Sequence, residues 1–429
     1  MPASEFGNLR RYTNRFAEVC YALRRKYFRT CSVVSVNSQR PTVNLALRIG
    51  RNLLANFTGL RDHAFKAAAV ISKCRTSELG THVARCSECG QVIDDANSCR
   101  SRFCPLCSVP RSNVWLAKWR ARLLPVDHWH LVFTIPHELN FFFKLYPARM
   151  GEIFFEAVRE TMTKLLRDPQ WLGARAGILM MLETWDNELK DHPHIHILLT
   201  SGGADETGAW RGFTRGPEFF IPHLVIARLF RKIFMALVRK AEYSGVIKPP
   251  AGWGFARRMK FLKAVSEKAF VVRICGPYGH GVGVLKYLAG HVKGGPIANS
   301  HILSVSSTHV TFRMEPRPGL VELERTLELE TFLKRWLAHI PPPGFHIVRA
   351  CGLYSPSSKL KVTGLPVSAE EEEAIPDDQP GFCPRCYQSI IVRDRGVIKT
   401  PRPPGPSHAR RFPTPARASP PDRAFTRLA

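Results

Sequence analysis

The spacing of apolar residues predicts helices and strands that are mixed through the middle of the chain. Helical spacing recurs about every 3.6 residues at 113–124, 147–166, 224–243, 283–292 and 321–339. Short apolar runs between turn residues predict strands at 130–135, 177–185, 195–200, 271–274, 302–305 and 310–312. This mixture indicates an α+β fold.

The two ends of the chain differ from this middle part. Residues 1–50 show no firm periodicity, and helical signals begin near Arg51 and run to Ile71. Beyond Ser355, an acidic run at 370–373 is followed by a Pro- and Arg-rich tail, which we expect to be disordered. We therefore expect four parts: an N-terminal extension (1–50), a small module (51–125), the main α+β domain (126–355), and a linker with a basic tail (356–429).

The charge of the chain indicates a nucleic-acid partner. Lys and Arg total 62 against 35 Asp and Glu, which gives a net charge of +27. Such an excess requires a polyanion to offset it. No apolar run reaches the roughly 18 residues of a membrane-spanning helix, and no secretion signal is visible at the N-terminus. We expect a cytoplasmic protein that binds DNA or RNA and no membrane.

Six of the twelve cysteines lie between Cys74 and Cys107, which favours a metal site over disulfides in such a protein. Two CxxC pairs, Cys86 with Cys89 and Cys104 with Cys107, have the spacing of a tetrahedral zinc site. Four thiolates close the coordination sphere and leave no position for a reactive water. The sequence therefore predicts a structural zinc.

Other cysteines leave alternatives open. Cys74, His82 and Cys99 could form part of a second site, or Cys99 could simply be a core residue. The C-terminal pair Cys383 and Cys386 resembles half a zinc site, which a dimer could share or which could be a remnant. We expect the basic tail to contact phosphates without regard to sequence.

A second constellation is the run His192-Pro193-His194-Ile195-His196. Residues two apart on a strand point to the same face, so His194 and His196 can reach one divalent ion while Ile195 points into the core. We expect Pro193 to interrupt the strand, so that His192 supports the metal site, contacts DNA, or is simply an exposed loop histidine. An isolated HxH is more often a strand edge with solvated histidine rings than a metal site. Only the surrounding motifs can distinguish the two.

A third constellation is the segment 283–291, which holds Tyr287 and, one helical turn later, His291. A tyrosine hydroxyl with a pKa of about 10 becomes a useful nucleophile where a metal polarises the phosphate and basic groups stabilise charge. Lys286 and Lys293 are available for that role. The same spacing also fits a helix that is merely packed into a core.

Together, the order of these motifs resembles that of the rolling-circle insertion-sequence transposases of the IS91-like family, relatives of the Helitrons. The resemblance rests on the cysteine module at 74–107, a strand at 130–139 that is similar to HxVFTxPHEL, the HPHIH run, and the tyrosine in a YLA segment. It covers roughly residues 56–355. It implies an HUH endonuclease-type antiparallel sheet with flanking helices, preceded by a zinc-binding module.

The resemblance also implies an activity. It predicts a nick in single-stranded DNA by Tyr287, a 5′-phosphotyrosine intermediate with a free 3′-hydroxyl, and transfer of the strand into target DNA. Mg²⁺ or Mn²⁺ held by His194 and His196 would assist. No GxxxxGK[ST] phosphate loop is present, so a helicase would come from the bacterial host, where we expect the protein at the nucleoid.

The chain departs from the family pattern at two positions. His291 stands where some members carry a second tyrosine, so one tyrosine must act twice or two subunits must cooperate. We expect His291 to be the third metal ligand, in competition with Glu183 and Asp186. Phe103 stands where the family usually has a histidine before Cys-Pro, which indicates that the zinc site does not need that histidine.

Two other functions compete with strand transfer. The chain could be a zinc-ribbon DNA-binding protein without catalysis, or a metal-dependent phosphodiesterase in which water attacks the phosphate. Only the tyrosine mechanism attaches the protein covalently to DNA.

Overall fold

The computed structural model describes residues 41–86, 90, 92–216, 220–292, 295–314, 324–368 and 391–392. The predicted disordered tail, most of the N-terminal extension, and Cys383 and Cys386 lie outside the described residues. Among the described residues, no helix combines the length and the apolar character that a membrane crossing requires.

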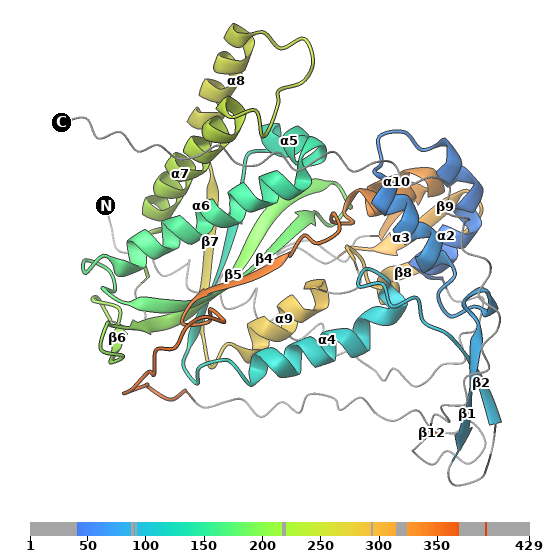
Figure 1. Ribbon diagram of the computed structural model, residues 1–429, viewed down its shortest axis with the longest axis horizontal. Coiled ribbons are helices and arrows are strands. Elements are labelled where there is room, and N and C mark those ends of the chain that lie inside the picture. Colours follow the sequence, from blue (N-terminus) through green and yellow to red (C-terminus); the bar gives the residue numbers. More distant parts are fainter. Residues whose placement is uncertain are drawn as a thin grey trace, which may run out of the picture.

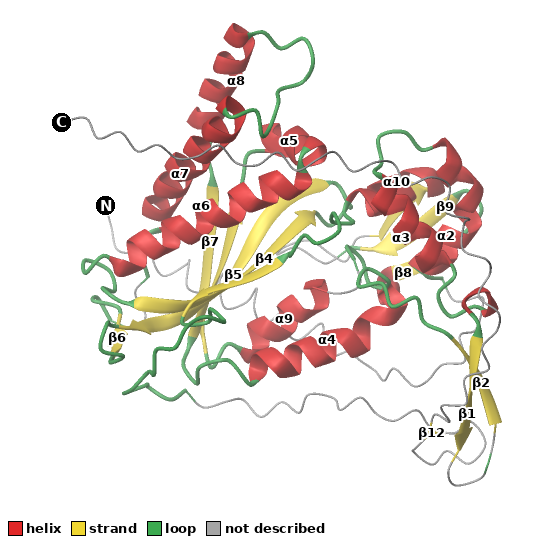
Figure 2. Ribbon diagram, viewed as in Figure 1, coloured by secondary structure: helices red, strands yellow, loops and turns green. Residues whose placement is uncertain are grey.

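The centre of the fold is an antiparallel sheet with helices on both faces (Figures 1 and 2). Its strands follow the order β11-β4-β5-β3-β7, and the short β6 pairs with β5 beside this path. The bounds are β3 (His128–Thr134), β4 (Arg175–Trp185), β5 (Asp191–Ala204), β6 (Trp210–Gly212), β7 (Val271–Tyr278) and β11 (Val348–Gly352). The predicted α+β class with an antiparallel sheet is confirmed.

Both faces of β5 are buried because its side chains alternate between two hydrophobic cores. Ile195 and Ile197 belong to the larger core, together with residues of α6 (Pro147–Arg167) and α7 (His223–Tyr243). Leu198 belongs to the smaller core, which α4 (Pro105–Arg120) and α9 (Val282–Val292) complete. The strand thus lies between two helical layers. Its register is fixed, because a one-residue shift would exchange the side chains of the two cores.

A second body of structure lies beside the sheet and joins distant parts of the chain (Figure 1). The N-terminal helices pack on α10, where Leu47 and Trp336 are fully buried in the same core. A hairpin extends from this body, and β12 pairs with β1 so that Cys86 lies opposite Ile391. The elements are α2 (Val43–Ile49), α3 (Asp62–Ser72), β1 (Thr81–Cys86), β2 (Val92–Ala96), β8 (Ile302–Val305), β9 (His309–Arg313), β10 (Glu324–Glu328), α10 (Leu329–Ala338) and β12 (Ile391–Val392).

Two further helices, α5 (Asn140–Leu145) and α8 (Phe255–Glu267), lie near one end of the main sheet. With α7, α8 forms the arm at the top of Figure 1. Four short 3-10 turns complete the described structure, at Gly50–Asn56, Ser77–Leu79, His137–Leu139 and Asn299–His301.

The structure corrects several predicted elements. The helix expected at 321–339 begins only at Leu329, because residues 324–328 form β10 against β9. The helix expected at 113–124 is α4, which already begins at Pro105 and ends at Arg120. The helical stretch from Arg51 to Ile71 is split into a 3-10 turn and α3, and α2 precedes it.

Pro193 does not interrupt its strand, contrary to expectation. It lies within β5, where the register against β4 shifts between the pairs at Glu183 and Trp185, and the pairing of β3 with β5 extends only to His194. Proline lacks the N–H that a regular ladder requires, so a bulge near the strand end tolerates it.

We expect Gly281→Ala to destabilise the start of α9. Gly281 has φ +73°, which favours glycine, and an added Cβ would lie 2.6 Å from Cγ of the buried His128 ring. Strain and overpacking together should cost about 3 kcal/mol and lower Tm in a thermal melt. Gly279→Ala is the control, because its Cβ would meet only Ser368 Oγ at 3.7 Å. Equal melting temperatures for the two variants would contradict this account.

Candidate active site

Three potential metal ligands converge on the face of the sheet that α9 covers. His194 and His196 alternate with Ile195 on β5, and Glu183 of β4 lies directly opposite His194 in the antiparallel pairing. Nε2 of His194 is 3.4 Å from Glu183 Oε2, and Nε2 of His196 is 3.5 Å from Glu183 Oε1. The ligand atoms all lie within 4.8 Å of one another. Two imidazoles and one carboxylate suit a divalent transition metal and leave coordination positions open for substrate.

The Nδ1 atoms of His194 and His196, which do not face Glu183, each contact a neighbouring polar group. His194 Nδ1 donates to the backbone carbonyl of His192 at 2.7 Å, and His196 Nδ1 lies 2.9 Å from His130 Nε2. These contacts direct both Nε2 atoms toward Glu183, which is the arrangement that orients a metal-binding histidine. Burial disfavours the charged form of His194, but the hydrogen bond and negative charge of Glu183 outweigh it and raise the pKa.

Tyr287 lies beside these ligands. Its ring centroid is 5.9 Å from that of His196 and 6.0 Å from that of His130. Leu285 and Leu288, on either side of Tyr287, are fully buried against the sheet, which fixes the orientation of α9. The tyrosine itself is only partly buried. A phenol beside three potential metal ligands is a candidate nucleophile.

The other predicted site residues lie outside the group of three potential metal ligands. Lys286 precedes Tyr287 on α9 and is partly exposed, and His192 is exposed with its ring 5.2 Å from that of His194. Lys293 and the side chain of His291 lie outside what the structure describes, so both roles stay predictions. Asp186 does not join the ligands, because its Oδ1 accepts hydrogen bonds from the backbone of Glu188 and Lys190 in the β4–β5 turn.

A separate cluster of four cysteines lies at the junction of the N-terminal body with α4. Cys74 follows α3, Cys99 follows β2, and Cys104 and Cys107 lie at the start of α4. Sγ of Cys107 is 3.5 Å from that of Cys74 and 3.8 Å from that of Cys99. Four sulfurs around one zinc, each about 2.3 Å from the ion, stand about 3.8 Å apart. These separations fit zinc and are too long for disulfides.

Two sulfurs of the cluster accept hydrogen bonds from their surroundings, and contacts between the sulfurs shift the thiol pKa values in opposite directions, down for Cys74 and Cys107 and up for Cys99 and Cys104. Asn44 Nδ2 donates to Cys104 Sγ at 3.3 Å, and the backbone N–H of Cys99 donates to Cys74 Sγ at 3.4 Å. The hydrogen bond from Cys104 lowers the pKa of Cys107, and the same contact raises the pKa of Cys104. The N-terminus of α4 adds a positive partial charge.

Among the described residues, the set of potential zinc ligands differs in part from the predicted one. The structure brings Cys104 and Cys107 together with Cys74 and Cys99, and four sulfurs fill a tetrahedral site. Cys86 ends β1, but its side chain and all of Cys89 lie outside the described residues. Spacing identified the CxxC at the start of α4 but could not reveal which distant thiols the fold brings to it.

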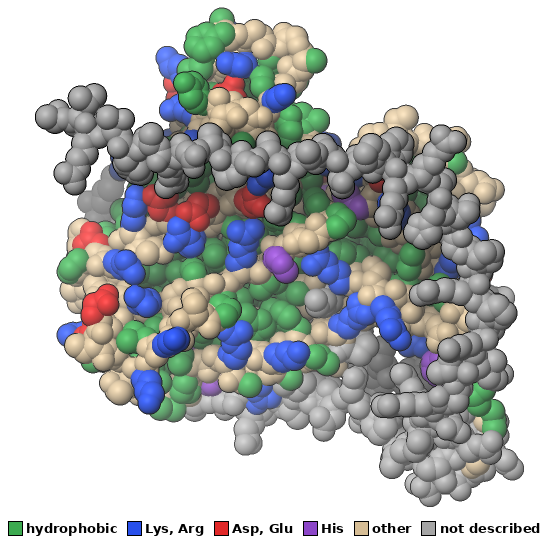
Figure 3. All heavy atoms as spheres, in the orientation of Figure 1, with side chains coloured by type: hydrophobic (Ala, Val, Ile, Leu, Met, Phe, Trp, Pro, Cys, Tyr) green, Lys and Arg blue, Asp and Glu red, His purple; other side chains and the backbone are tan. Residues whose placement is uncertain are grey.

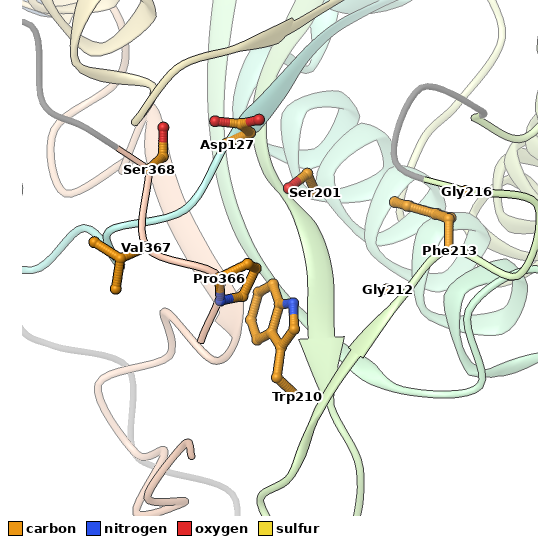
Figure 4. A pocket seen from close by; sticks show the side chains of 9 residues that line it. All are labelled: Asp127, Ser201, Trp210, Gly212, Phe213, Gly216, Pro366, Val367 and Ser368. Carbon is orange, nitrogen blue, oxygen red and sulfur yellow. The ribbon is translucent and has the colours of Figure 1, made fainter. Parts of the chain in front are cut away.

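One face of the molecule carries many basic side chains (Figure 3). Figure 3 shows Lys and Arg side chains around an area of hydrophobic side chains on one face. A hollow of about 330 Å³, lined by Asp127, Ser201 and Trp210 among others, lies at the opposite end of the main sheet (Figure 4). Seven residues of β5, or about 23 Å, separate His194 from Ser201, so this hollow is not part of the metal site.

Comparison with protein families matches residues 46–135 to a model described as "Transposase zinc-binding domain" and residues 177–361 to one described as "Putative transposase". The first range contains all four clustered cysteines, and the second contains Glu183, both ligand histidines and Tyr287. The chain belongs to the IS91-like family of transposases. The predicted family and the structural zinc of this module are thereby confirmed.

Two curated transposases are similar to the chain along most of their length. A putative transposase, y4qJ, of Sinorhizobium fredii is 29% identical over 381 residues, which cover 83% of this chain and 96% of the relative. The transposase for insertion sequence element IS801 of Pseudomonas savastanoi pv. phaseolicola is 27% identical over 352 residues, or 78% of this chain and 80% of the relative. No solved structure matches the chain significantly.

Substitution of Cys99 tests the ligand set of this transposase. We expect Cys99→Ser to contain one zinc ion fewer per chain than the wild type, measured by native mass spectrometry. We also expect a loss of at least about 3 kcal/mol of stability, since structural zinc contributes roughly 10–16 kcal/mol of apparent binding energy. Cys351→Ser, which lies outside the cluster, should keep the full zinc content. Full zinc content in Cys99→Ser would show that another residue holds the ion.

Substitution of Glu183 tests which residue is the third metal ligand, a question that the sequence alone left open. Loss of a residue that only supports a ligand lowers metal affinity about 10- to 100-fold, so Glu183→Gln should weaken Mn²⁺ binding by at least roughly 100-fold in calorimetric titration. Glu152→Gln, on the exposed surface of α6, serves as the control. If His291→Ala weakens binding and Glu183→Gln does not, His291 is the third ligand.

Proposed function

We propose that this transposase nicks and rejoins single-stranded DNA through a covalent bond to Tyr287. The observation that carries the proposal is the position of the Tyr287 ring, about 6 Å from the rings of His196 and His130 and beside three converging metal ligands. A nucleophile adjacent to a metal with open coordination positions is suited to phosphoryl transfer.

In the proposed reaction, Oη of Tyr287 attacks the phosphorus of a phosphodiester and loses its proton. The bond from phosphorus to the 3′ oxygen breaks, and that oxygen takes up a proton to leave as a 3′-hydroxyl. The 5′-phosphate stays attached to Tyr287. A 3′-hydroxyl of another DNA end then attacks the phosphotyrosine, which restores the phenol and joins the strands. The exchange conserves one phosphoester bond throughout, so no nucleotide hydrolysis is needed.

Mg²⁺ or Mn²⁺, held by His194, His196 and Glu183, would polarise the phosphate oxygens and offset the charge that develops on them. The residues of the chain do the rest. The carbonyl of His192 and the ring of His130 contact the Nδ1 atoms of the two imidazoles, and α9 presents the phenol. Lys286, Lys293 and His192 are proposed to contact the DNA phosphates on either side of the scissile bond.

Partners follow from the same proposal. The substrates would be single-stranded element ends and target DNA, with a host helicase supplying the unwound strand at the bacterial nucleoid. Because residue 291 is histidine, a complete cycle would use Tyr287 twice or combine two copies of the chain. A dimer is the simplest way to supply a second tyrosine.

Covalent attachment to DNA is the decisive test. The wild-type protein with Mn²⁺ should shift 3′-labelled single-stranded oligonucleotides, which tile the DNA flanking its gene, to protein size on a denaturing gel. Tyr287→Phe should reduce this adduct at least about a thousandfold, as expected for loss of a nucleophile. Tyr243→Phe, 96% exposed on α7, should leave it unchanged.

Two results would overturn the proposal. Cleavage that survives in Tyr287→Phe would identify water as the nucleophile and the protein as a phosphodiesterase. Binding without adduct or cleavage on any oligonucleotide would favour a DNA-binding protein without catalysis.

A further inference from the structure

A cluster of aromatic side chains lies at the surface between α5 and α8, away from the metal ligands. The ring centroids of Phe141, Trp253 and Phe261 are 5.1–5.6 Å apart. Together with Glu138, Arg257, Lys260 and Ala264, they line an open hollow of about 450 Å³. Partly exposed aromatic side chains that gather around a hollow are typical of a binding surface.

The charges around this cluster are mainly positive. Arg257 lies over the Trp253 ring at 4.9 Å, and Lys260 and Lys263 are exposed on the same helix. In the part of the chain that the structure describes, no ion pair involves these three residues. The acidic group in the lining, Glu138, is already paired with Lys268 at 3.2 Å. The arm at the top of Figure 3 accordingly shows both hydrophobic and basic side chains.

The cluster lies at the same end of the sheet as the metal site. Thr134, the last residue of β3, pairs with His194 on one side and with Val271 on the other. The chain leaves β3 there and reaches Phe141 seven residues later. Helix α5 is also tied to the start of β5, because Lys144 Nζ is 2.7 Å from Asp191 Oδ2. The cluster packs on the core of the α6–α7 face and the metal ligands lie on the α9 face, so a DNA strand would reach the cluster by passing around this edge of the sheet.

We propose that Phe141, Trp253 and Phe261, with Arg257 and Lys260, form a docking surface for single-stranded DNA, on which unpaired bases stack. We refer to these five residues as the stacking surface. Every base has a face that can stack on an aromatic ring, while cations beside the ring hold the phosphates. Duplex DNA hides its base faces, so the stacking surface favours unpaired strands. This inference rests on the proposed use of single-stranded DNA.

The experiment measures DNA binding without cleavage. Full-length, zinc-loaded protein carrying Tyr287→Phe is titrated against fluorescein-labelled oligo-dT and against a duplex of equal length, without added Mg²⁺ or Mn²⁺, by fluorescence anisotropy. Trp253→Ala should weaken binding of oligo-dT by roughly 5- to 150-fold, the effect of losing one stacked base. Trp253→Phe should restore most of it, and duplex binding should change much less.

Two further variants separate stacking from folding and from charge. Trp210→Ala removes a tryptophan beside the hollow at the opposite end of the sheet and should bind oligo-dT like the parent. The exposed pair Arg257→Ala and Lys260→Ala should lower the slope of log affinity against log salt by roughly 1.4, or 0.7 for each lost phosphate contact. This double variant keeps the aromatic packing intact, so it is informative even if Trp253→Ala is unstable.

Unchanged oligo-dT affinity in both the Trp253→Ala and the Arg257/Lys260 variants would overturn the proposal. Equal losses for single-stranded and duplex DNA would also overturn it, because they would show a purely electrostatic surface. The outcome is independent of catalysis. If Tyr287 forms no adduct but Trp253→Ala still weakens oligo-dT binding, the proposed function fails and the stacking surface stands.

Discussion

The alternation of side chains along β5 is the constraint on which the rest of the site depends. Ile195 and Ile197 are fully buried on one face, and Leu198 is fully buried on the other. A shift of one residue would move His194 and His196 into the apolar core under α6 and would turn the isoleucines toward Glu183 on the other face, at a cost of several kcal/mol. The metal ligands are therefore held by the burial of their neighbours, and no loop has to position them.

Tyr287, the proposed nucleophile, is positioned by a different part of the molecule. Tyr287 is carried by α9, which packs on α4, and α4 begins at the cysteine cluster. Cys74 and Cys99 bring the ends of α3 and β2 to that same point. A zinc ion there would fix the start of α4 and, through it, the position of α9 against the sheet. Through this connection, the zinc-binding module would position the helix that carries the proposed nucleophile.

The sequence predicted those features that depend on neighbours along the chain, and it failed where distant segments meet. The shared face of His194 and His196 follows from strand geometry, and the bounds of β8 were predicted correctly. Glu183 could be identified only as one of several candidates, because its place opposite His194 depends on the β4–β5 turn and its bulge. The pairing of Cys74 and Cys99 with the CxxC of α4 depends on three separate elements. The charged α8 has too little apolar periodicity to be predicted, although it carries most of the stacking surface.

The contact between His130 and His196 adds a constraint that acts on the metal site itself. If His196 binds an ion through Nε2, its neutral ring must carry the proton on Nδ1 and donate it to His130 Nε2, 2.9 Å away. His194 meets the same condition with the carbonyl of His192 as acceptor. The carbonyl of His192 can only accept, so it fixes this tautomer for His194, whereas His130 Nε2 can accept or donate and therefore permits it for His196. One acceptor is backbone, which no substitution removes, whereas the other is a side chain that also lies beside Tyr287. His130 therefore contacts both a potential metal ligand, His196, and the proposed nucleophile, Tyr287.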